Sequence, residues 1–189
     1  HSDLEPKKYW DRRARGLGAT DVRPSVSCGE ENLLEFPGDP YSKENILVHE
    51  FAHAVHIMGL NSLDSGFDAK LKSVYDSAMQ EKLWQGTYAA SNKEEYWAEG
   101  VQSYFDTNRC NDPQHNEIDT REELQKYDPR LAALIADSYK SPTWRYQRPS
   151  ARQSRGHLTG FDSANSPKFA WPEALDRWYQ EHGKDAEPK

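Results

Sequence analysis

Residues 48–56 read Val-His-Glu-Phe-Ala-His-Ala-Val-His, or VHEFAHAVH in one-letter code. In a helix, residues four apart lie one above the other, so His49 and His53 can point their ring nitrogens at one metal ion. Glu50 lies about 100° around the helix from His49, where it can take a proton from a metal-bound water. This H-E-x-x-H spacing is typical of catalytic zinc sites. We therefore predict that a helix through these residues organises the fold.

The motif supplies two ligands, whereas a catalytic zinc usually has three protein ligands and one open position. A third histidine six residues after His53 would fall on position 59, which is occupied by Gly59. His56 leans towards the face of His49 but lies two turns further along the helix, so ligation by all three histidines would be strained. We interpret His56 as a neighbour of the ligands or a surface residue. We expect the motif helix to run from Ser42 to Met58 and to stop at Gly59.

A second helix, expected over residues 91–107, offers carboxylates for the third position. It contains Glu95-Tyr-Trp-Ala-Glu99, in which the two glutamates are four apart and share one face. One of them can bind zinc while the other accepts the remaining N–H of a ligand histidine. The aromatic residues of this segment would pack it against the motif helix.

HEFAH at residues 49–53, followed by Tyr88 and by Glu95-Tyr-Trp-Ala-Glu99, resembles the gluzincin metallopeptidases, specifically the family of the anthrax lethal factor protease domain and the Pro-Pro endopeptidases. In that family a tyrosine precedes the ligand glutamate by seven residues, as Tyr88 precedes Glu95 here. The resemblance covers roughly residues 43–107. It implies zinc bound by His49, His53 and Glu95, with Glu50 as the general base, Tyr88 as the stabiliser of the oxyanion and Glu99 as the support of a ligand histidine.

The fold implied is a single zincin-like metallopeptidase domain over residues 1–189. It would be mainly α-helical (α+β), with little β structure and a long irregular C-terminal arm. The HExxH helix would pack on the helix that carries the glutamate ligand. The function implied is that of a secreted, zinc-dependent endopeptidase that hydrolyses a peptide or protein substrate with a zinc-activated water. The alternative is a non-catalytic, zinc-containing binding module on a peptidase scaffold.

The composition of the chain indicates where the protein acts and which partners it does not bind. The net charge of −7 argues against nucleic acid as a partner, and no apolar run is long enough for a membrane span. The chain starts at His1 rather than methionine and contains six Trp and ten Tyr, from which we expect a processed, secreted protein. We also expect a monomer. In an exported protein Cys28 and Cys110 would pair as a disulfide, and the alternative is two free thiols.

Residues 140–157 are basic and contain no acidic residue. The positive residues are Lys140, Arg145, Arg148, Arg152 and Arg155. In one interpretation this segment packs over the acidic body of its own chain, and in the other it borders the substrate cleft and selects substrates. We expect His115, His157 and His182 on the surface.

Overall fold

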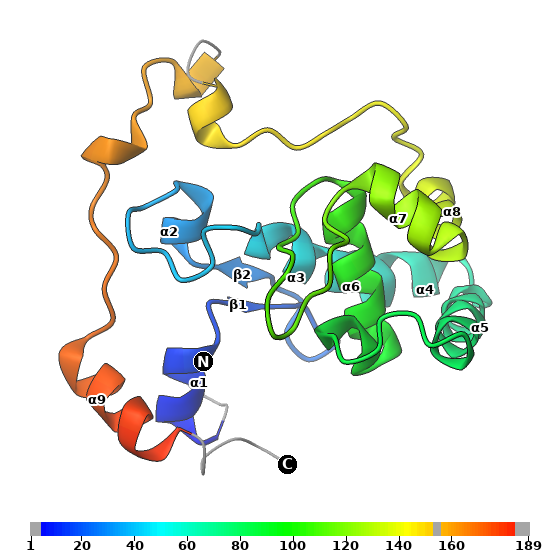
Figure 1. Cartoon of the computed structure of the whole chain (residues 1–189), viewed down its shortest axis with the longest axis horizontal. Coiled ribbons are helices and arrows are strands. Elements are labelled where there is room, and N and C mark those ends of the chain that lie inside the picture. The colour runs from blue at the N-terminus through cyan, green and yellow to red at the C-terminus, as the bar shows by residue number, and fades with distance from the viewer. Residues whose placement is uncertain (1–4, 153–155, 184–189) are drawn as a thin grey trace.

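The computed structural model describes residues 5–152 and 156–183. Within these residues the protein is mainly helical, as the sequence predicts, and its named strands form one short hairpin. β1 (Gly16–Leu17) pairs antiparallel with β2 (Ser27–Cys28), so that Gly16 lies opposite Cys28. The hairpin lies against α3 (Ile46–Ala54), the helix that carries the HExxH motif (Figure 1).

Two helices, α3 and α6 (Lys93–Tyr104), form the centre of the molecule and pack against each other. Every residue of α6 from Tyr96 to Tyr104 is buried. The indole N–H of Trp97 donates a hydrogen bond of 2.9 Å to the main-chain carbonyl of Ala52 in α3. Because Ala52 directly precedes His53, this bond fixes the position of α6 along the motif helix.

The motif helix begins and ends later than the sequence predicts. Asn45, rather than Ser42, caps α3, because its side chain accepts a hydrogen bond of 3.1 Å from the amide of Val48. The predicted stop at Gly59 is wrong. The helix continues through the π-helical segment η1 (Val55–Leu60) and then α4 (Asn61–Leu63).

The start of α6 places its glutamates. The side chain of Asn92 caps the helix by accepting a hydrogen bond of 2.8 Å from the amide of Glu95. Glu95 therefore lies in the first turn, where the positive end of the helix dipole stabilises a carboxylate.

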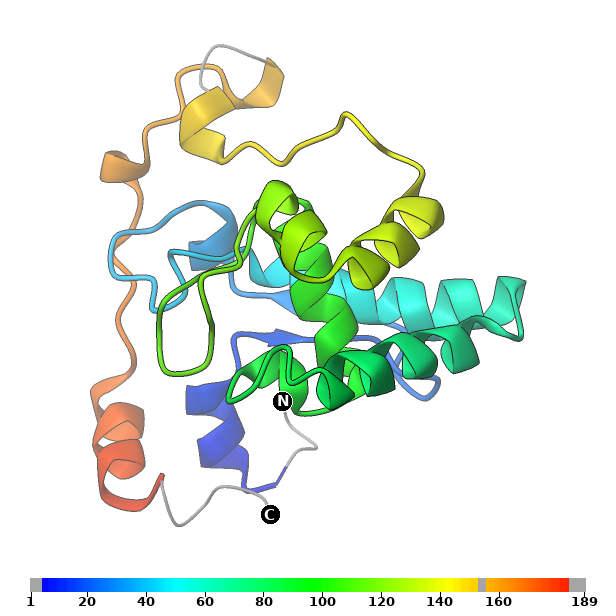
Figure 2. The ribbon, with the colours of Figure 1, turned by 45° about the vertical axis from the view of Figure 1, so that its right-hand side comes forward.

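Helices α5 (Phe67–Gln80), α7 (Arg121–Tyr127) and α8 (Pro129–Tyr139) and the 3₁₀ turn η2 (Tyr88–Ala90) pack against α6 (Figure 2). The described residues also form the short helix α2 (Glu30–Leu33) and the 3₁₀ turns η3 (Pro149–Arg152), η4 (Gly156–Leu158) and η5 (Ser163–Asn165). α8 lies very close to α6 at Gly100, where a Cβ would come within 2.5 Å of the Leu131 side chain. A glycine at this point therefore permits the approach of the two helices.

The segment after α8 runs around the outside of the molecule, as both views show. Two of its arginines bind acidic and main-chain groups of the body. Arg145 forms an ion pair of 2.5 Å with Glu122, and Arg148 donates a hydrogen bond of 2.7 Å to the carbonyl of Ser42. These contacts favour the interpretation that the basic segment packs over its own chain. Arg155 lies outside the described residues.

The chain then returns to the N-terminal helix. α9 (Glu173–His182) packs beside α1 (Lys7–Arg13) at one end of the molecule (Figure 1). Arg12 links the two helices, since its Nε lies 2.9 Å from the carboxylate of Asp176 and its guanidinium stacks on the Trp171 ring at 4.3 Å.

The predicted disulfide is wrong, because both cysteines are free. The Cys28 thiol lies on the hairpin and contacts the carbonyl of Gly29, whereas Cys110 follows α6 and faces Asp119. The two thiols thus face different parts of the molecule. Burial raises the pKa of Cys28 to about 12.

The helices among the described residues are too short or too polar to cross a bilayer.

Candidate metal centre

Three ligand atoms converge between α3 and α6. The Nε2 atoms of His49 and His53 lie 3.2 Å apart, and Glu95 Oε2 lies 3.0 Å from the first and 3.6 Å from the second. Ligands about 2.0–2.2 Å from a tetrahedral zinc lie about 3.3–3.6 Å from one another. Two imidazole nitrogens and one carboxylate oxygen at these separations fit a zinc ion with one open position.

Gln102 of α6 fixes the protonation pattern of His49. The amide nitrogen of Gln102 donates to the main-chain carbonyl of Asn45 at 3.2 Å and to the carboxylate of Glu44 at 3.1 Å. Its amide oxygen consequently faces His49 Nδ1 at 2.8 Å, and because an amide oxygen can only accept, Nδ1 carries the hydrogen. The lone pair of His49 is therefore left on Nε2, the atom that points at His53 and Glu95.

Replacement of Gln102 by leucine is expected to lower zinc affinity by about 10- to 100-fold, because the N–H of a ligand histidine loses its acceptor. A competition titration against a coloured zinc chelator would measure the change. The matched control is Gln80→Leu, at an exposed position on α5. Equal zinc affinity in a folded Gln102→Leu variant and the wild type would contradict this role.

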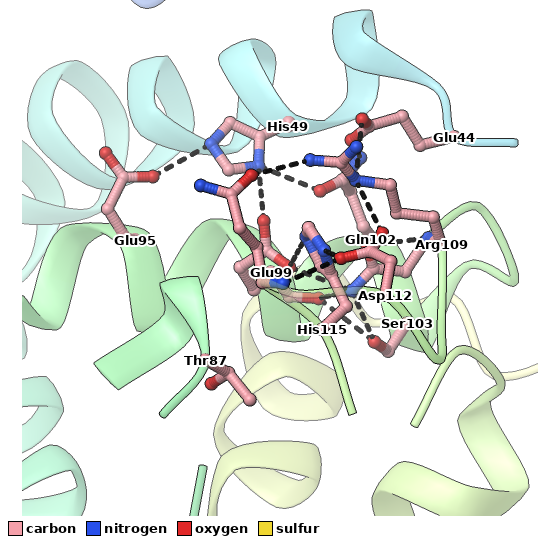
Figure 3. A network of polar contacts seen from close by, with 12 residues as sticks. Glu44, His49, Thr87, Glu95, Glu99, Gln102, Ser103, Arg109, Asp112 and His115 are labelled. Carbon is pink, nitrogen blue, oxygen red and sulfur yellow. Dashed lines mark hydrogen bonds and ion pairs between the residues drawn. The ribbon is translucent and has the colours of Figure 1, made fainter. Parts of the chain in front are cut away.

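A buried network continues behind the histidine (Figure 3). Glu99 places one carboxylate oxygen 3.4 Å from His49 Nδ1 and the other 3.2 Å from His115 Nε2. Asn108 donates to Glu99 at 3.0 Å, and Asp112 lies 2.8 Å from the other ring nitrogen of His115. Glu99 thus lies next to His49, as the resemblance implies, although Gln102 is the closer acceptor.

The prediction that His115 lies on the surface is wrong. Its side chain is 5 % exposed, because the segment after α6 folds back against the helix. The carbonyl of Gln114 accepts a hydrogen bond of 2.7 Å from the amide of Tyr88 and so holds this segment beside the site. By contrast, His157 and His182 are exposed, as predicted.

The arrangement of charges favours a cation between the two helices. Burial lowers the pKa of His49, but its contacts with Glu95 and Glu99 outweigh this effect and hold the pKa well above its ordinary value. Burial raises the pKa of Glu95, and the two motif histidines outweigh it and hold that pKa well below its ordinary value. The carboxylates therefore stabilise positive charge here, which suits a divalent metal ion.

Glu50 lies on the side of α3 that faces the β-hairpin. A Cβ on Gly16 would come within 2.7 Å of the Glu50 carboxylate, so the glycine leaves the space that this side chain occupies. Burial raises the pKa of Glu50 above its ordinary value. A carboxylate with a raised pKa is a stronger base than an exposed one.

Tyr88 comes to the same place from η2, the turn that precedes α6. Its ring stacks on the His49 ring with 6.3 Å between centroids. Burial raises the pKa of the phenol, and the neighbouring carboxylate of Glu95 raises it further. Tyr88 is therefore protonated at neutral pH and can donate a hydrogen bond.

A pocket of about 540 Å³ opens over these residues. Residues 13–20, which connect α1 to the hairpin and include β1, form one wall, and the first turn of α6 with Tyr88 forms another. Within the described residues, the basic segment contributes no side chain to this pocket. The site is therefore open to a ligand larger than water, and this volume lies within the usual range for ligand pockets.

The structure corrects the interpretation of His56. This side chain is neither on the surface nor beside the ligands, since it is 1 % exposed and packs against the rings of Phe67 and Trp97. Its Nε2 lies 3.1 Å from the carboxylate of Asp68. The π-helical turn that begins at Val55 changes the direction of His56 relative to the motif, and no sequence pattern indicated such a turn.

The structure brings the side chains predicted from the sequence to one pocket, but the sequence analysis missed several of their neighbours. Gln102 lies seven residues after Glu95 and therefore on the same face of α6, a signal that could have identified it. Arg13 and His115 approach the pocket only through the tertiary fold. Comparison of the chain with family models, curated proteins and solved structures gives no match.

Proposed function

We propose that the chain is a zinc-dependent endopeptidase with a zincin-like arrangement of α3 and α6. The observation that carries this proposal is the triangle of His49 Nε2, His53 Nε2 and Glu95 Oε2 in the wall of an open pocket, with Glu50 beside it. Three protein ligands leave one coordination position open, which is typical of catalytic rather than structural zinc sites.

When bound, zinc would supply a water of lowered pKa and a Lewis acid for the substrate carbonyl. Glu50 takes the proton of the attacking water and later delivers it to the leaving amine. Its buried position supports this role, because burial raises the pKa of the carboxylate towards the pH at which the proton must be both taken and returned.

Tyr88 donates its hydroxyl hydrogen to the negative charge that develops on the substrate oxygen. A donor that is already in place stabilises such a charge without reorganisation during the reaction. The stacking of Tyr88 on His49 and the bond from its amide to Gln114 support this role, because they hold the ring at the site.

The substrate in this proposal is an extended peptide. β1 and the residues on either side of it form a wall of the pocket next to Glu50. A second extended chain pairs most readily with a backbone that is itself extended. Such a peptide would place its scissile carbonyl between Glu50 and Tyr88.

Digestion of a mixed peptide library tests the proposal. Purified protein with one equivalent of zinc is expected to cleave members of the library. Cleavage should stop after treatment with a chelator and resume when zinc is returned. Stoichiometric zinc without cleavage would contradict the peptidase and indicate the binding module instead. Protein that binds no zinc would contradict the metal centre itself.

A further inference from the structure

Arginines line the pocket beside the candidate metal centre, and they differ in their partners. Arg15 pairs with Glu31, and Arg109 Nε lies 3.2 Å from the carboxylate of Glu44. Arg13 lines the same pocket but forms no ion pair with any carboxylate of the described residues. Its hydrogen-bond partner is the hydroxyl of Tyr41, at 3.4 Å from Nη1.

Among the residues that the structure describes, no carboxylate serves as a counter-ion to Arg13. The groups that act electrostatically on it are tyrosine hydroxyls, which are neutral at pH 7. These belong to Tyr41, Tyr88, Tyr9 and Tyr179. Burial lowers the pKa of the guanidinium, but the tyrosines outweigh this effect and keep it raised, so the group is charged. A half-buried cation without an anion nearby is stabilised by an anionic ligand.

The unpaired charge lies close to the groups proposed to carry the reaction. The positive charge of Arg13 lowers the pKa of the Tyr88 phenol, the group that would bind the oxyanion. Both side chains line the pocket that His49 and Glu50 line. A substrate in contact with these residues would therefore pass within reach of Arg13.

The position of Arg13 is held by the fold. The hydroxyl of Tyr41 donates a hydrogen bond of 2.8 Å to the main-chain carbonyl of Arg13. The neighbouring Arg12 ties the same turn of α1 to Asp176 in α9. Binding of an anion would therefore cost little ordering of the main chain at this point.

We propose that Arg13 binds a carboxylate of the substrate, so that the enzyme prefers peptides with a carboxylate close to the scissile bond. This inference rests on the proposed function. The carboxylate can be the C-terminus of a short peptide or the side chain of Asp or Glu, since both present two oxygens to the fork of a guanidinium.

The experiment uses one neutral peptide that the library identifies as a substrate. It is prepared with or without one acidic residue, and each form with a free or an amidated C-terminus. The wild type is expected to show a kcat/KM about 10- to 100-fold higher on a carboxylate-bearing form than on the neutral amidated form. The form that gains shows whether the C-terminus or a side chain is bound.

Arg13→Gln is expected to lose this preference, mainly through a higher KM for the carboxylate-bearing peptide. Arg13→Lys, which keeps the charge but not the fork, is expected to retain part of the preference. The matched control is Lys7→Gln, which removes one charge at an exposed position of the same helix and should leave the preference intact.

Three outcomes overturn the inference. They are a wild type without preference for any carboxylate-bearing form, an Arg13→Gln variant that keeps the full preference, and a Lys7→Gln variant that loses it equally. The first of these requires only the wild-type protein and so does not depend on the folding of any variant. A wild type that cleaves no peptide would instead overturn the proposed function.

Discussion

Replacement of Glu50 by glutamine is expected to lower kcat/KM for every cleaved peptide by about 10²- to 10⁴-fold, the usual contribution of a general base. Glutamine has the shape of glutamate but cannot accept a proton. The proposed ligand atoms of His49, His53 and Glu95 are not altered, so the variant is expected to retain one equivalent of zinc. Steady-state kinetics together with metal analysis of the same sample measure both effects.

The control is Glu117→Gln, which makes the same chemical change at an exposed position away from the pocket and is expected to leave kcat/KM unchanged. A Glu50→Gln protein that holds zinc and cleaves peptides at the wild-type rate would exclude Glu50 as the base. Simultaneous loss of zinc would instead show that Glu50 acts on the metal centre.

Replacement of Glu95 by alanine is expected to lower zinc affinity by more than about 100-fold. Loss of a group that only hydrogen-bonds to a ligand lowers affinity by roughly 10- to 100-fold, and Glu95 is itself a proposed ligand. The replacement removes one of three ligand atoms and the negative charge nearest to the two motif histidines. Peptidase activity should disappear together with the metal. Competition titration and metal analysis after dialysis are the measurements.

Glu94→Ala is the matched control, since Glu94 is adjacent in the sequence but pairs with Lys93 and is absent from the ligand cluster. It is expected to retain zinc with wild-type affinity. A Glu95→Ala protein with wild-type affinity would mean that another carboxylate completes the site.

The sequence predicted those parts of the site that depend on local geometry. The spacing of four residues places His49 and His53 on one face of a helix whatever the rest of the chain does. The same spacing places Glu95 and Glu99 on one face of α6. The structure brings the histidines and Glu95 together, and the predicted helical character of the chain is confirmed.

What the sequence could not predict depends on tertiary contacts. The predicted end of the motif helix was wrong, because a π-helical turn that has no sequence signal continues the helix past Gly59. The disulfide was inferred from an expected compartment, whereas pairing depends on the distance between two thiols in the fold. The burial of His115 and the unpaired charge of Arg13 follow from how distant segments pack, and no local pattern encodes either.

The burial of α6 has a consequence for how this chain can vary. From Tyr96 to Tyr104 the helix has no side exposed to water, because one face holds the candidate metal centre and its network while the other packs against α5 and α8. Selection for folding and selection for chemistry therefore act on the same short run of residues. Few substitutions in that run are expected to be neutral, and sequence change should accumulate instead in the outer segment between α8 and α9. Within α6, a substitution at one position will often require a compensating change on α3 or α8.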